Sequence, residues 1–225
     1  PGFWLDASSW DGVAPGLRAV GHEVEALTLP GLESREADRS GIGLRTHVDA
    51  VIDRIDAAEG PVVLVGHSGA GAVVWAAADA RVDRVARLVY VDTGPLGDGG
   101  IVSDEWAAEG ADIPFPDWDD FDEPELTDLD EGLRASLRER AVPHPLGASI
   151  ERQRLADERR YALPSTIVCC SMPVTQLREL LDSGHPYMAE ASKLRDVEIV
   201  GLLTGHWPQL TKPAELTSVI LDAVG

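Results

Sequence analysis

The stretch LVGHSGAGAVVWAAADA, from Leu64 to Ala80, places a serine between glycines where an apolar run ends and an alanine-rich run begins. Residues 61–65 (PVVLV) predict a short buried strand, because a β-branched run follows a proline. Residues 70–80 predict a buried helix. The residues between them must reverse the chain abruptly. Such a turn lifts the Ser68 hydroxyl above the edge of a sheet, beside the positive end of the following helix.

Predicted strands and helices alternate along most of the chain. Residues 44–58 predict a helix, because Val48, Val51 and Ile55 fall on one face. We expect further strands at 22–29, 86–92, 165–170 and 197–203, and further helical stretches at 133–140, 148–160, 175–195 and 213–224. Alternation of this kind predicts an α/β fold with a mostly parallel sheet and helices on both faces.

The interval from 95 to 162 interrupts the alternation. It begins with a stretch rich in proline and acidic residues, and no core strand can be placed in it. We therefore expect a core formed by residues 1–94 and 163–225, with 95–162 inserted as a mainly helical cap at the carboxyl edge of the sheet. Phe115, Trp118 and Phe121 alternate with acids in this interval, and packing of the cap onto the core accounts for them best.

Composition excludes several classes of function. The net charge of −20 argues against binding to nucleic acid or to an anionic membrane surface, and no apolar run is long enough to span a bilayer. The cysteines Cys169 and Cys170 are adjacent in a predicted strand, so they point to opposite faces and form no bridge. A reducing, cytoplasmic compartment is the default expectation. The chain opens at Pro1 in a wide loop, so we expect a strand to precede it, and targeting stays open.

The residues Gly66-His67-Ser68-Gly69-Ala70 resemble the nucleophile elbow of the α/β-hydrolase family, whose pattern is G-x-S-x-G. The small side chain of Ala70 stands at the last position. The resemblance implies that Ser68 is a nucleophile. It also implies that the backbone N–H of Gly69 forms half of an oxyanion hole.

The opening residues PGFW resemble a loop of small family members such as plant methyl-ester esterases and hydroxynitrile lyases, with Pro1 in place of the usual histidine. The resemblance implies that the backbone N–H of Phe3 is the second oxyanion donor. Near the other end, His206 follows the last predicted strand and precedes the last helix, where the family keeps its catalytic base. The candidate substrate contacts are Trp4, His67, Trp118 and Trp207, although His67 is expected to support the site more than to act in it.

The acid of a catalytic triad is missing from its usual place in this family. No Asp or Glu lies between Thr166 and Arg178, around the end of the strand that follows the cap. Asp196 precedes the last strand, at the opposite edge of the sheet, and Asp182 lies late in a helix. Asp92 ends a strand at the correct edge, where some members of the family place their acid. We therefore predict Asp92 as the acid, against the alternative that it only caps the turn that follows.

The resemblance implies a serine hydrolase that cleaves a small-molecule ester through an acyl-enzyme, with a thioester or lactone as further possibilities. This chemistry needs no cofactor, and no metal-ligand cluster or phosphate-binding loop is visible. A lyase of the hydroxynitrile type is an alternative, although the predicted cap lacks the lysine expected to assist it. A non-catalytic receptor or carrier is the other alternative. The sequence says nothing about the oligomeric state.

Overall fold

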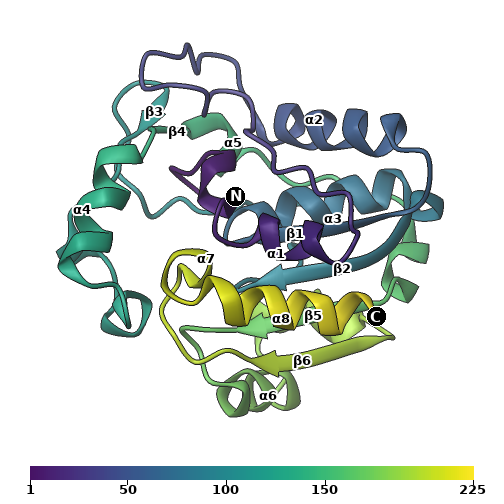
Figure 1. Ribbon diagram of the computed structural model, residues 1–225. Helices are drawn as coiled ribbons and strands as arrows, with labels where there is room; N and C mark the ends of the chain where they lie inside the picture. The colour runs from purple at the N-terminus through teal and green to yellow at the C-terminus, as the bar shows by residue number, and fades with distance from the viewer.

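The computed structural model describes residues 1–225 and has a parallel four-stranded sheet at its centre (Figure 1). The strand order is β1-β2-β5-β6, and every neighbouring pair is parallel. The strands are β1 (Val62–His67), β2 (Val85–Val91), β5 (Ser165–Cys169) and β6 (Val197–Gly201). Because all four strands run in one direction, their carboxyl ends meet at one edge.

Successive residues of the central strands contribute to cores on opposite faces of the sheet. On β2, Leu88 and Tyr90 belong to one buried cluster, whereas Val89 and Val91 belong to another. The first cluster is covered by α2 (Leu44–Ala57), α3 (Ala70–Ala80) and α6 (Val174–Asp182), and the second by α1 (Ala14–Ala19) and α8 (Pro213–Val224) (Figure 1). The predicted α/β fold, a mostly parallel sheet with helices on both faces, is confirmed. Cys169 and Cys170 are free and lie in the two different clusters, as expected.

Two predicted elements are wrong. Residues 22–29 pair with no strand, although they contain the alternating pattern of one. Val24 and Ala26 pack half-buried on the core, so the alternation is that of an extended segment lying on the molecule. The helix predicted over 148–160 is broken, because Gln153 exchanges backbone hydrogen bonds with Gly99 and Gly100 (2.8 and 2.7 Å). Only α5 (Leu146–Ile150) and a 3-10 turn at Glu158–Ala162 form there.

The strands within 95–162 are separate from the main sheet. They are β3 (Asp112–Ile113) and β4 (His144–Pro145), an antiparallel pair that accompanies α4 (Glu131–Arg140). A third buried cluster joins this segment to the N-terminal loop and to the loop before α7 (Pro208–Thr211). Its members are Phe3, Trp4, Leu5, Ile113, Phe121, Leu129, Leu137, Ala141 and Trp207. The division into core and cap stays a prediction.

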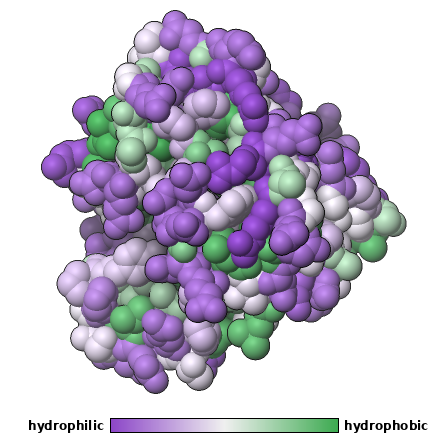
Figure 2. All heavy atoms as spheres, turned by 90° about the vertical axis from the view of Figure 1, so that its left-hand side faces the viewer, coloured by the Kyte–Doolittle hydropathy of each residue, from purple (hydrophilic) through white to green (hydrophobic).

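The remaining elements are short 3-10 turns at Ala7–Trp10, Val82–Arg84, Trp118–Asp120, Glu123–Leu126, Pro186–Met188 and Ala191–Lys193. The face turned toward the viewer in Figure 2 is the one that carries α4 and lies on the left in Figure 1. Hydrophilic side chains cover most of it, with small apolar patches between them. No helix combines the length and the apolar character needed to cross a bilayer.

Candidate active site

Ser68 and Asp92 are the first residues beyond the carboxyl ends of the neighbouring strands β1 and β2. Both have left-handed backbone conformations, with φ of 53° at Ser68 and 49° at Asp92. Trp4 shares this conformation (φ 62°), and Asp128 is the only other non-glycine residue with positive φ. Such conformations cost on the order of 1–3 kcal/mol each, and they concentrate at functional sites. Here they turn the two side chains out above the edge of the sheet.

The elbow depends on a glycine at its start. A Cβ on Gly66 would lie 2.8 Å from Val74 Cγ2 and 2.9 Å from the carbonyl oxygen of Ala70. Only glycine therefore lets α3 begin so close to the end of β1. The resulting turn places Ser68 at the start of α3, where the N-terminal end of the helix dipole favours a developing negative charge.

His206 lies between the two residues that the strand ends present. Its Nε2 is 2.9 Å from Ser68 Oγ, and its Nδ1 is 2.7 Å from Asp92 Oδ2. Because an ionised carboxylate only accepts hydrogen bonds, Nδ1 carries the proton and Nε2 is free to accept one. This arrangement is able to remove the proton from the Ser68 hydroxyl and to stabilise the resulting imidazolium. Asp182 and Asp196, the other acids considered, are exposed and make no hydrogen bond to His206.

Asp92 is held ionised by four donors. Its Oδ1 accepts the backbone N–H groups of Cys170 and Ser171, both at 2.9 Å, and its Oδ2 accepts the hydroxyl of Ser171 at 2.6 Å as well as His206. Burial alone would raise the pKa of this carboxyl, but the bonds from His206, Ser171 and Cys170 outweigh burial and lower the pKa to about 2. Cys170 and Ser171 lie in the stretch after the strand that follows the cap, where the sequence shows no acid, and nothing in the local pattern marks them as donors. The parallel pairing of β2 with β5, which aligns Val91 with Val168, is the signal that predicts their contact with Asp92.

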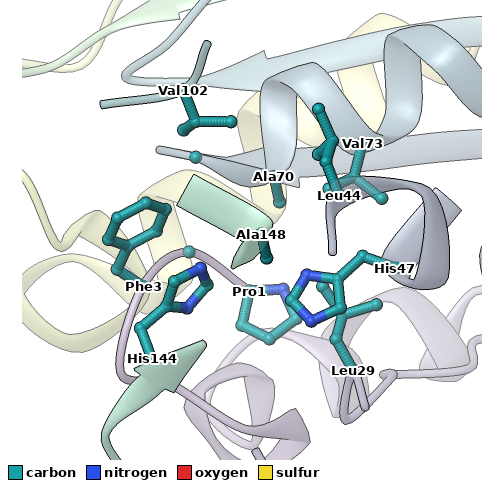
Figure 3. Close-up of a pocket in the computed structure, with 12 residues that line it drawn as sticks. Pro1, Phe3, Leu29, Leu44, His47, Ala70, Val73, Val102, His144 and Ala148 are labelled. Carbon is teal, nitrogen blue, oxygen red and sulfur yellow. The ribbon is translucent and has the colours of Figure 1, made fainter. Parts of the chain in front are cut away.

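The predicted oxyanion donors lie on two loops that touch at the serine. A Cβ on Gly2 would lie 2.6 Å from Ser68 Cβ, and one on Gly69 would lie 2.5 Å from the Phe3 ring. Neither the N–H of Phe3 nor that of Gly69 donates a hydrogen bond within the chain. Both donors are therefore available to an oxygen bound at Ser68. The Phe3 ring stacks on His144 with 3.7 Å between centroids and an interplanar angle of 12° (Figure 3).

A cavity of about 910 Å³ opens in front of Ser68. Phe3, Gly69, Asp92 and His206 border it with the serine, and the candidate substrate contact Trp4 lines its wall.

The other three candidate substrate contacts do not border this cavity. His67 is buried next to His206, and the centroids of the two imidazole rings are 4.8 Å apart. Trp118 and Trp207 pack against each other at the third buried cluster, with 6.2 Å between their ring centroids. The structure therefore brings Trp4 to the cavity and leaves these three outside it.

The walls of the cavity carry more acidic than basic side chains. The carboxylates that line it are Asp92, Asp98, Asp104, Glu105, Glu125 and Glu190, and its cations are Arg160 and Lys193. Both cations are paired with Glu190, at 3.4 and 2.9 Å. No group of three or more His, Cys, Asp or Glu side chains is arranged to hold a metal ion.

Comparison with proteins of known sequence identifies one curated relative. A carbendazim-hydrolysing esterase of Nocardioides sp. (strain SG-4G) is 37% identical over 94 residues, which are 40% of this chain and 38% of the esterase. The match therefore spans little more than a third of that relative's length.

Solved structures resemble the whole chain at low sequence identity. An extracellular alpha/beta-hydrolase from a Paenibacillus species has a TM-score of 0.75 and 22% identity, covering 99% of this chain and 96% of its own. A pyrethroid hydrolase from Sphingobium faniae JZ-2 has a TM-score of 0.67 and 21% identity over 100% and 95% of the two chains. A methylesterase of Arabidopsis, MES16, has a TM-score of 0.70 and 14% identity over 99% and 95%. A sequence profile of the alpha/beta hydrolase family matches residues 1–219, and the chain belongs to this family.

Proposed function

We propose that this protein is a serine hydrolase that cleaves the ester bond of a small molecule through an acyl-enzyme. The observation that carries the proposal is the continuous hydrogen-bonded chain from Asp92 through His206 to Ser68. The relative that is an esterase and the similar structure of a methylesterase support the choice of an ester. A thioester or a lactone would react through the same steps.

The reaction begins when Ser68 Oγ attacks the substrate carbonyl and its proton passes to His206 Nε2. The N–H groups of Phe3 and Gly69 stabilise the negative charge that develops on the carbonyl oxygen. The tetrahedral intermediate collapses as His206 returns the proton to the departing alcohol. Water then attacks the acyl-serine with His206 as base, and the second collapse releases the acid and restores Ser68. Asp92 remains ionised throughout and stabilises the imidazolium.

The charges of the cavity favour a substrate without negative charge. Its two side-chain cations, Arg160 and Lys193, are already paired with Glu190, whereas Asp104 and Glu105 are exposed on its wall. An anionic substrate would approach these carboxylates without a free cation to bind it. The same field repels the carboxylate product and so assists its release.

A fluorophosphonate probe tests the proposal directly, because it reacts only with an activated serine. We expect the probe to label the wild-type protein and not Ser68→Ala, while Ser218→Ala, which changes an exposed serine on α8, keeps the labelling. The wild-type protein and Ser218→Ala should also hydrolyse neutral p-nitrophenyl esters, and Ser68→Ala should not. Absence of labelling in the wild-type protein would favour a receptor or carrier. Release of cyanide from a cyanohydrin, without ester hydrolysis, would favour a lyase.

A further inference from the structure

His67 makes contacts with three segments that meet at the candidate site. It is the last residue of β1, and only 1% of its surface is exposed. Its Nε2 lies 2.6 Å from the backbone oxygen of His206, and its Nδ1 lies 3.3 Å from Gln209 Nε2 on α7. A Cβ on Gly2 would come within 3.0 Å of the same Nδ1, so the N-terminal loop also packs on this ring.

These partners define the proton positions on the His67 ring. The carbonyl oxygen of His206 only accepts hydrogen bonds, so Nε2 must carry a proton. Burial lowers the pKa of His67 and so favours the neutral ring, in which Nδ1 has a free lone pair and the amide NH2 of Gln209 is the donor that matches it. Gln209 is itself buried, with 1% exposure, and its Oε1 has no partner. The amide thus leaves its own oxygen unpaired while its nitrogen contacts the ring.

The peptide groups on either side of His206 are both held by hydrogen bonds. Its N–H donates to the carbonyl oxygen of Glu125 at 2.7 Å, and its carbonyl oxygen accepts from His67. The imidazole of His206 must reach Asp92 and Ser68 simultaneously, so its backbone has little freedom to shift. Displacement of a reacting group by about 1 Å is enough to cost on the order of a hundredfold in rate.

We propose that His67 is a positioning residue for the base of this site: as a neutral imidazole protonated at Nε2, it holds the His206 backbone where the His206 ring spans Asp92 and Ser68. The inference rests on the proposed function, because His206 has to be the base for its position to affect the rate. It assigns His67 a role in geometry and not in substrate contact.

Neutrality of His67 is required for this role. Burial lowers the pKa of His67 well below its usual value, and the neighbouring His206 lowers it further, whereas the hydrogen bond to the His206 carbonyl and the charge of Asp92 oppose the shift. A neutral His67 donates its hydrogen bond without repelling the imidazolium that forms on His206 during the reaction. The rings of the two histidines are 4.8 Å apart, so a charged His67 would oppose that step.

Two variants of His67 separate positioning from packing. His67→Gln places an amide NH2 near the position of Nε2 and keeps a donor for the His206 carbonyl, whereas His67→Leu removes the donor. We expect His67→Leu to lower kcat by about 10- to 100-fold with KM unchanged, and His67→Gln to recover most of that loss. His47→Leu is the matched control: His47 is also 1% exposed, and its Nε2 also contacts a backbone oxygen, that of Pro30, at 2.9 Å. It should lose stability and keep kcat.

Nitrogen-15 spectra of histidine-labelled wild-type protein provide a second test that needs no variant to fold. We expect His67 to remain the neutral tautomer protonated at Nε2 throughout the pH range in which the enzyme is active. Protonation at Nδ1 alone, titration within that range, or wild-type kcat in His67→Leu would overturn the proposal. Equal losses of kcat in His67→Leu and His67→Gln would also overturn it, if both variants fold. If Ser68→Ala retains activity, the proposed function itself fails, whatever the spectra of His67 show.

Discussion

Replacement of Asp92 by asparagine changes the charge of the predicted acid while keeping its shape. Oδ1 of Asp92 accepts two backbone N–H groups, from Cys170 and Ser171, so the carbonyl oxygen of an asparagine must take that place. Its NH2 group then replaces Oδ2 and faces Nδ1 of His206, which lies 2.7 Å from Oδ2 in the wild-type protein. The hydroxyl of Ser171 is able to accept a hydrogen bond from the same amide. We therefore expect Asp92→Asn to fold.

The amide reverses the proton positions on the base. Because an NH2 group donates, Nδ1 of His206 must become an acceptor, and the ring proton moves to Nε2. Nε2 then faces Ser68 Oγ, 2.9 Å away in the wild-type protein, with a proton where it needs a lone pair. In a serine protease the same exchange lowers kcat by about 10⁴-fold, and we expect a loss of that order here. KM should change little, because the lost interaction acts in the transition state.

Steady-state hydrolysis of a neutral p-nitrophenyl ester measures both constants, and circular dichroism verifies the fold. Asp182→Asn and Asp196→Asn are matched controls, since both carboxylates are exposed. They should retain wild-type kcat. A kcat for Asp92→Asn within about tenfold of the wild-type value would refute the reasoning, because the wrong tautomer leaves the serine without a base.

Three further predictions concern other parts of the site. Gly69→Ala should lower kcat by about 100-fold or more in the ester assay, because its Cβ would lie 2.5 Å from the Phe3 ring and displace an oxyanion donor. Gly60→Ala is the control and should not change kcat, because a Cβ at Gly60 would meet no atom within 4 Å. Arg160→Met should lower the free energy of unfolding by about 3–5 kcal/mol in urea titrations, since it leaves the buried carboxylate of Asp79 without a cation and Glu190 with Lys193 alone. A loss below about 1 kcal/mol would contradict this. The pKa of Asp92 is lowered from 3.8 to about 2, so ionised Asp92 stabilises the fold fully above pH 4 or so, and this contribution is lost as the pH falls through about 2. The difference in unfolding free energy between the wild-type protein and Asp92→Asn should therefore shrink as the pH falls from about 4 to 2. A difference that does not depend on pH would contradict the idea that ionisation of Asp92 stabilises the fold.

The elements that the sequence predicted correctly are those whose own residues determine them. The helix at 70–80 and the strand before it follow from an uninterrupted apolar pattern bounded by glycines, and the structure places α3 at Ala70–Ala80. The segments predicted wrongly are determined by contacts with distant residues. Residues 148–160 have helical composition, but Gln153 finds its backbone partners in the loop at 99–100, and its side chain donates to Ala72. No local pattern predicts such bonds.

The candidate site also contains residues that the sequence predicted and a contact that it did not. The family resemblance of the residues around Ser68 and His206, together with the position of Asp92 at a strand end, was enough to predict that the three side chains lie together, because the carboxyl ends of parallel strands meet at one edge of the sheet. The contact of His67 with the His206 carbonyl was not predictable, since it depends on the path of a loop after β6. Whether a buried histidine acts on substrate or on another residue is decided by that path.

The ends of two neighbouring strands supply the predicted acid and the hydrogen-bond donors that it accepts. The ends of β2 and β5 are adjacent, so a carboxylate on either could reach the same histidine. Once Asp92 occupies the end of β2, the end of β5 must supply donors, because a second carboxylate there would raise the pKa of the first by repulsion. Ser171 meets this requirement with its N–H and its hydroxyl, both of which donate to Asp92. The absence of an acid after β5 and the presence of one after β2 are therefore two parts of a single arrangement, in which Ser171 adds to His206 as a donor that keeps Asp92 ionised.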